Sequence, residues 1–182
     1  MNKWILPKTA TIGGAEYAIN TDFRDVMEIM DHLNNTEYPQ MLRWQIAIAL
    51  FFEGDIPSEH QAEAANYLAE FISYGEQGKK PGPKLLDWNQ DAQMIISDVN
   101  KVAGTEIRAL PYLHWWTFLG YFYGIGEGQL STIVSIRNKK KKGKKLEKWE
   151  EEFYRDNHDK VDFQRAETAE DKEAQNYFNK WL

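Results

Sequence analysis

The side chains that most often bind metals or transfer protons are few and scattered in this sequence. The histidines are His32, His60, His114 and His158, and none has the spacing of a metal-binding motif such as His-Glu-x-x-His. His60 and Glu63 can share one face of a helix, but no further ligands accompany them. We therefore expect no metal site, and ordinary surface or core positions for the histidines.

A glycine-rich stretch, GIGEG, occupies residues 124–128. It follows an apolar segment rather than a strand, and it matches neither Gly-x-Gly-x-x-Gly nor the P-loop, whose last glycine precedes Lys and then Ser or Thr. It is typical of a joint between two helices. No Gly-x-Ser-x-Gly motif is present, and carboxylates are so widespread that no catalytic pair stands out. We expect no catalytic residues, no cofactor and no enzymatic activity.

Positive charge is concentrated in residues 137–145, whereas acidic residues predominate before and after this block, and the whole chain has a net charge of −6. Three interpretations remain open. The lysines can be a solvated loop that meets the negative end of the preceding helix dipole, a protein-binding patch, or a nucleic-acid patch that gains affinity by releasing counterions. The acidic remainder of the chain disfavours nucleic acid, because it repels phosphates.

The segment from 110 to 125 is almost entirely apolar and aromatic. Hydrophobic side chains around the whole circumference predict a helix buried on all sides, with Pro111 in its first turn. The segment is shorter than the roughly 20 apolar residues of a membrane-spanning helix. We therefore expect it to form the centre of a core.

The N-terminal part predicts a β-hairpin over residues 9–19, with Gly13 and Gly14 in the turn. Pairing Ile12 with Ala15 places alternate side chains, including Ala10 and Tyr17, on one face that can be buried.

Further patterns predict a series of helices. Thr21 is the expected N-cap of the first, which runs to about Leu33. A second runs from about 39 to 52, and a third follows a capping box of Ser58 and Gln61. Asp87 is the expected N-cap of a fourth, which stops at Gly104, and another runs over residues 129–137.

The C-terminal part predicts a helix from 146, with Trp149 and Phe153 on its apolar edge and Glu147, Glu150, Glu151 and Glu152 outside. Glu151 is placed to pair with Arg155. Residues 157–172 have the composition of a polar tether. The aromatic residues near 177–181 fall at helical spacing, so this end can fold back on its own domain or dock on a partner.

Length and composition agree with one compact domain, since 182 residues with 42% hydrophobic content can enclose a sizeable core. The chain has no cysteine, which excludes disulfides, thiol catalysis and cysteine-bound zinc. The apolar run at the N-terminus is too short for a signal peptide. We predict a mainly α fold, with a single compact helical domain and N-terminal hairpin over residues 1–157. Residues 158–182 are expected to form a polar tether and a short amphipathic aromatic helix.

Several of these segments together resemble a family of phage proteins encoded between the major tail protein and the tape measure protein of siphophages that infect Gram-positive bacteria. The resemblance spans residues 12–157. It is carried by the hairpin leading into NTDFRD (20–25), by ALFF (49–52) with Pro57, and by YLHWWTFLG (112–120). The segments IVSIR (133–137), the lysine run and LEKW (146–149) complete it.

The resemblance implies a tail assembly chaperone, a helical and non-catalytic protein that binds the tape measure protein and recruits the major tail protein. It implies a location in the host cytoplasm and absence from the mature virion. A structural tail or neck component that stays in the virion and a nucleic-acid binder that uses the lysine loop are the alternatives. The chain can also form a homo-oligomer. From the residues themselves, we expect partner contacts at Arg137, Lys139, Lys140, Lys141, Lys142, Lys144, Lys145, Trp149, Phe153, Tyr177, Phe178 and Trp181.

Overall fold

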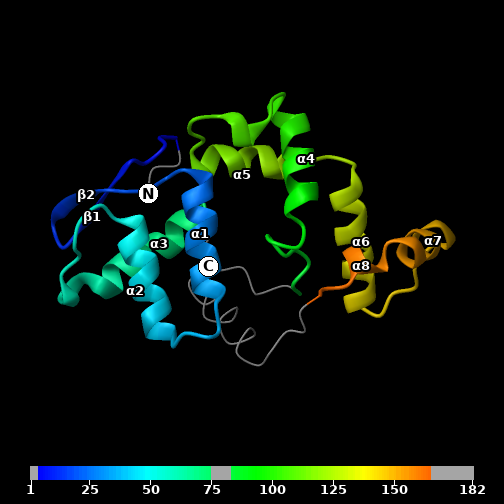
Figure 1. Cartoon of the computed structure of the whole chain (residues 1–182), viewed down its shortest axis with the longest axis horizontal. Coiled ribbons are helices and arrows are strands. Elements are labelled where there is room, and N and C mark those ends of the chain that lie inside the picture. Colours follow the sequence, from blue (N-terminus) through cyan, green and yellow to red (C-terminus); the bar gives the residue numbers. More distant parts are fainter. Residues whose placement is uncertain (1–3, 75–82, 165–182) are drawn as a thin grey trace. The chain divides into compact units, whose positions relative to one another are not determined.

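The computed structural model describes residues 4–74 and 83–164 (Figure 1). It is mainly helical with a short N-terminal hairpin, which confirms the predicted fold class. By their internal contacts, the described residues divide into two compact units. The first comprises 4–74 and 112–119, and the second comprises 83–111 and 120–164.

The hairpin of the first unit consists of β1 (Thr9–Ile12) and β2 (Ala15–Ala18). The predicted register is confirmed, because Ile12 pairs with Ala15 and Ala10 pairs with Tyr17. Gly13 and Gly14 both have positive φ, as a tight hairpin turn requires. Ala10 and Ile12 are buried, and β1 packs on α3. The alternating pattern has therefore predicted the buried face of β1, whereas in β2 Tyr17 is only half-buried and Ala15 is exposed.

The remainder of the first unit is helical, with α1 (Phe23–Asn34), α2 (Gln40–Phe51), the short 3-10 helix η1 (Ser58–His60) and α3 (Gln61–Ile72). In Figure 1, α1 and α2 run side by side, and α2 also packs on α3. Apolar side chains from these helices and from the start of α5 are fully buried, namely Val26, Ile29, Phe51, Leu68, Phe71, Trp115 and Phe118.

Two predicted helix caps in the first unit are wrong. Asp22, rather than Thr21, caps α1, since its side chain accepts a hydrogen bond from the amide of Arg24, while the Thr21 hydroxyl bonds the Tyr112 hydroxyl at 2.7 Å. Ser58 forms no capping box with Gln61, because η1 intervenes and the Gln61 amide instead donates to the carbonyl of Ile56. The side chains of Thr21 and Gln61 thus form contacts that a local sequence pattern does not show.

The apolar segment forms a shorter helix than predicted, α5 (Trp115–Tyr123). Its first residues are extended because the chain around 113–115 pairs with the start of α1. Phe23 donates its amide to the carbonyl of Leu113, and Trp115 donates to that of Thr21. The helix is also not buried on all sides, because Tyr123 is exposed.

The second unit contains α4 (Ala92–Ala103), the 3-10 helix η2 (Ile107–Ala109), α6 (Gln129–Lys141), α7 (Lys148–Asp156) and α8 (His158–Val161). Gly104 ends α4 in the left-handed conformation, as predicted. Asp87 caps the turn that precedes α4 rather than the helix itself, because its carboxylate accepts from the amides of Asn89 and Gln90.

The packed structure continues beyond Asn157, where the sequence predicts a polar tether. The four-residue helix α8 buries Val161 against Ile133 and Ile136 of α6. Leu146 and Phe153 pack against the same cluster. Residues 158–164 therefore belong to the second unit.

Candidate partner-binding surface at the basic turn

Arg137, predicted as part of an exposed basic patch, is instead buried in the interior of the second unit. Its side chain is only 3% exposed and forms a two-armed ion pair with Asp91, whose side chain is fully buried. The two N–H···O distances are 2.6 and 2.9 Å. A guanidinium in this position cannot contact a partner, so we remove Arg137 from the candidate surface.

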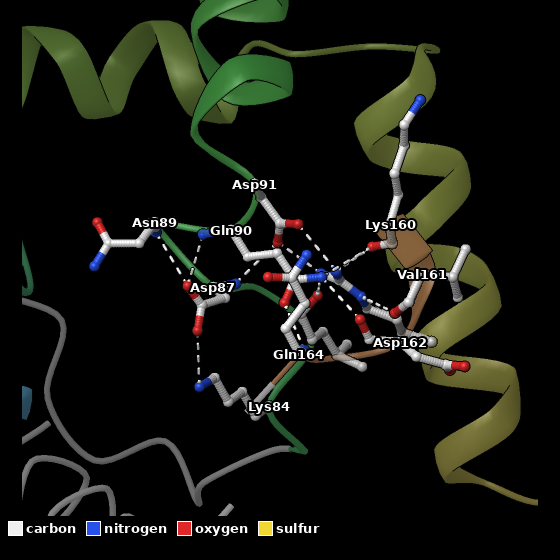
Figure 2. A network of polar contacts seen from close by, with 11 residues as sticks. Lys84, Asp87, Asn89, Gln90, Asp91, Lys160, Val161, Asp162 and Gln164 are labelled. Carbon is white, nitrogen blue, oxygen red and sulfur yellow. Dashed lines mark hydrogen bonds and ion pairs between the residues drawn. The ribbon is translucent and has the colours of Figure 1, made fainter. Parts of the chain in front are cut away.

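The remaining donors of Arg137 fix the surrounding chain, and Figure 2 labels Asp91, Lys160 and Val161 in this polar network. Nε donates to the carbonyl of Val161, and the two terminal nitrogens also donate to the carbonyls of Leu85 and Lys160. All five N–H groups of the guanidinium are thus used, which is the full capacity of this side chain. The guanidinium also lies 4.2 Å from the ring centre of Phe163. We call these residues the Arg137 cluster, and it holds residues 160–163 in place.

Two of the predicted partner-binding lysines form bonds within the second unit. Lys139 donates to the carboxylate of Glu150 at 2.7 Å, and Lys140 donates to that of Asp162 at 2.6 Å. Lys140 also lies 3.7 Å above the ring of Tyr154, a cation–π contact. Burial lowers the pKa of Lys140, but its bonds with Asp162 and Tyr154 outweigh that effect and raise the pKa above its usual value.

Glu150, predicted to lie outside, is only 1% exposed. Its carboxylate accepts both the Lys139 ammonium and the amide of Glu147, the N-cap of α7. The hydrogen bond from Lys139 is the main reason why the pKa of Glu150 is lowered, although burial opposes it. Glu150 therefore joins the end of α6 to the start of α7.

Between these helices, residues 142–145 form a defined turn, which we call the basic turn. The amide of Lys144 donates to the carbonyl of Lys139, and that of Gly143 donates to the carbonyl of Lys140. This pair of bonds is a Schellman motif, and Gly143 supplies the left-handed residue that it needs, with φ of 63°. The chain is thus fixed on both sides of the lysines.

The basic turn presents Lys142, Lys144 and Lys145 to solvent, together with Trp149, which is 57% exposed. Phe153 is half-buried against the cluster of Ile133, Ile136 and Val161, so it contributes less to the surface than predicted. Lys141 is exposed as well. Tyr177, Phe178 and Trp181, which are also predicted to contact partners, lie outside the described residues. The structure therefore narrows the described candidate surface to the basic turn, Lys141 and Trp149.

Two buried acidic residues, Asp91 and Asp98, were not predicted from the sequence. Asp98 stands on the same side of α4 as Ile95 and Val99, and a carboxylate within an apolar stripe was the available signal. Lys101 binds one of its oxygens at 2.6 Å. A Cβ atom at Gly128, the residue before α6, would lie 2.9 Å from the other oxygen. Glycine at this position therefore leaves room for the carboxylate.

Among the residues described, no group of three or more histidine or acidic side chains is arranged to hold a metal ion. In the same part of the chain, no helix has both the length and the apolar character needed to cross a membrane.

The protein is thus mainly helical with an N-terminal hairpin. It presents a surface that combines exposed lysines with an exposed tryptophan. The family model for the bacteriophage Gp15 protein matches residues 4–163. The chain therefore belongs to the bacteriophage Gp15 protein family and is a phage protein. Searches of curated proteins and of solved structures found no significant match.

Proposed function

We propose that this phage protein is a non-catalytic tail assembly chaperone. It binds the tape measure protein and recruits the major tail protein in the host cytoplasm during tail morphogenesis. Membership of a bacteriophage family supports a role in building the phage particle. The observation that carries the proposal is the exposed Trp149 beside the lysines of a turn that is fixed on both sides.

The physical requirements of such a chaperone agree with this surface. A long helical client that aggregates needs a partner with accessible apolar groups and contacts weak enough to be released later. An exposed aromatic ring supplies contact area, while exposed ion pairs add little affinity and are screened by salt. Reversible binding in many copies is the expected result.

A second exposed apolar region lies on the first unit and fits a protein with more than one partner. On and just before α2, the side chains of Tyr38, Met41 and Leu42 are exposed, and that of Met41 is 75% exposed. This region carries little charge of its own, with Glu37 before it and Arg43 after it in the chain. Each unit thus has exposed apolar side chains of its own, which supports a protein that binds two partners.

Co-expression tests the proposal directly. The tagged protein should retain the tape measure protein of the same phage and keep it soluble, and it should then bind the major tail protein. Mass spectrometry of purified virions should detect both clients but not this chain. A protein that binds neither client, or that is found in virions in stoichiometric amounts, contradicts the chaperone role. The second result would favour a structural tail or neck component.

A further inference from the structure

The basic turn differs from a flexible lysine loop in that its backbone is already ordered. The Schellman motif closes it on the α6 side, and the capping box of Glu147 and Glu150 begins α7 on the other side. The ion pair between Lys139 and Glu150 connects these two ends at 2.7 Å. A surface that is ordered before binding loses less conformational entropy when a partner arrives.

Charge at the turn is only partly neutralised by the protein itself. Lys139 and Lys140 have carboxylate partners, whereas within the described part of the chain the ammonium groups of Lys142, Lys144 and Lys145 have none. These side chains are exposed and close together in sequence. Their combined charge favours a partner that brings carboxylates to the same place.

Trp149 adds an apolar anchor to this charged surface. It follows the basic turn in the first turn of α7 and leaves more than half of its surface in water. Tryptophan is among the residues that contribute most to binding when a partner covers it. A partner that is complementary to this surface has an apolar pocket for the indole ring and carboxylates around the pocket for the lysines.

We propose that the basic turn and Trp149 form a docking surface for an acidic protein surface whose apolar pocket accepts the indole ring. This inference rests on the proposed function and names the chemistry of one of its partners. A protein fits better than nucleic acid because Glu147, Glu151 and Glu152 are exposed beside Trp149. These carboxylates repel a phosphate backbone, whereas a protein can confine its own carboxylates to the positions that face the lysines.

Carbodiimide cross-linking tests the charge contacts, because it joins a lysine to a carboxylate that touches it. The full-length protein is mixed with the tape measure protein or with the major tail protein, and the products are mapped by mass spectrometry. We expect Lys142, Lys144 or Lys145 to be linked to Asp or Glu of one of these partners. Affinity for that partner is then measured at low and high salt.

Two sets of variants connect the cross-links to binding. Replacing Lys142, Lys144 and Lys145 with Gln should weaken binding about tenfold at low salt and less at high salt. Trp149→Ala should weaken it about tenfold or more at both salt concentrations, while Trp149→Phe should retain much of the affinity. As a matched control of opposite sign, Glu151→Gln with Glu152→Gln should tighten binding at low salt. Each side chain is exposed, so the thermal midpoints should match that of the wild type.

The outcomes separate this inference from the proposed function. If the wild type binds both phage proteins and all variants bind them equally well, the docking surface is wrong and the chaperone role stands. If the wild type binds neither protein, both proposals fail. A surface that prefers DNA or RNA to both proteins, and loses that preference in the lysine variants, also overturns the acidic-protein assignment.

Discussion

At the scale of single residues, the side chain with the largest structural consequence is Arg137. It brings α6, residues 85–91 and residues 160–163 together through one guanidinium. Breaking a buried ion pair by removing one partner typically costs 3–5 kcal/mol, because the other charge remains buried without compensation. Arg137 therefore acts on the surface only indirectly, by fixing the helix that carries the lysines.

We predict that Arg137→Met lowers the free energy of unfolding by about 3–5 kcal/mol. Arg137→Lys should also be destabilising, since an ammonium offers three donors in place of five. Urea unfolding followed by tryptophan fluorescence measures both effects. Combining Arg137→Met with Asp91→Asn should recover part of the loss, because no buried charge is then left unpaired. A cost below about 1 kcal/mol for Arg137→Met would show that the cluster contributes little to stability.

The surroundings of the individual basic residues could not be predicted from the sequence. The composition of residues 137–145 predicted one continuous basic patch, but each basic side chain has its own surroundings. Arg137 points into the core. Lys139 is paired with Glu150 of α7, and Lys140 is paired with Asp162. The basic turn remains exposed. These differences arise from carboxylates distant in sequence, which a local charge pattern does not reveal.

At the scale of elements, local periodicity predicted those features whose partners are near in sequence. The register of the hairpin and the end of α4 at Gly104 follow from turn residues and alternation. The start of α5 did not follow from such patterns, because residues 113–115 form backbone bonds with 21–23. A helical pattern alone cannot show that an extended pairing with a distant segment competes for the same amides.

The residue just before α5 is a histidine with a defined proton position. His114 is 2% exposed, and its Nδ1 accepts the amide N–H of Trp116 at 3.0 Å. The proton of the neutral ring must then be on Nε2, which donates to the carbonyl of Pro7 at 3.0 Å. Burial is the main reason why the pKa of His114 falls below 6.5. The charge of Lys8 adds to this decrease, while the bond to Pro7 opposes it.

This arrangement predicts a pH dependence at the junction between the N-terminal segment and α5. Because the unfolded state binds the proton near pH 6.5 and the folded state binds it only at lower pH, stability should decrease as the pH falls below 6.5. The slope is at most about 1.4 kcal/mol per pH unit for one proton. It should disappear once the pH is below the folded pKa. Denaturant titrations at a series of pH values measure this slope.

His114→Gln is the control for the pH effect, since glutamine is neutral throughout this range. This variant should be less stable than the wild type but should lose the dependence between pH 6.5 and the folded pKa. Asp22 provides a separate acid response. Burial raises its pKa, but bonds from Arg24 and the Leu113 amide outweigh that effect and place it below 3.8, so its contribution is lost only in stronger acid. An unchanged slope in His114→Gln would assign the effect to another group.

At the scale of the whole molecule, the chain divides into two compact units, and each buries apolar side chains of its own. The first contains Leu68 and Phe71, and the second contains Ile133, Ile136 and Val161. The candidate docking surface belongs to the second unit, whereas the exposed residues near α2 belong to the first. Because the cores are separate, we expect the order of each surface to depend on the stability of the unit that carries it.

Hydrogen exchange can measure this separation with two matched core variants. Arg137→Met removes a buried group of the second unit, and Leu68→Ala removes one of the first at a typical cost of about 2–5 kcal/mol. We predict that Arg137→Met accelerates amide exchange in α4, α6 and α7 while α1 and α2 remain protected. Leu68→Ala should do the reverse, because local opening depends on the contacts within each cooperative unit. If either variant accelerates exchange equally in all of these helices, the two units unfold as one, and the surfaces that they carry are energetically coupled.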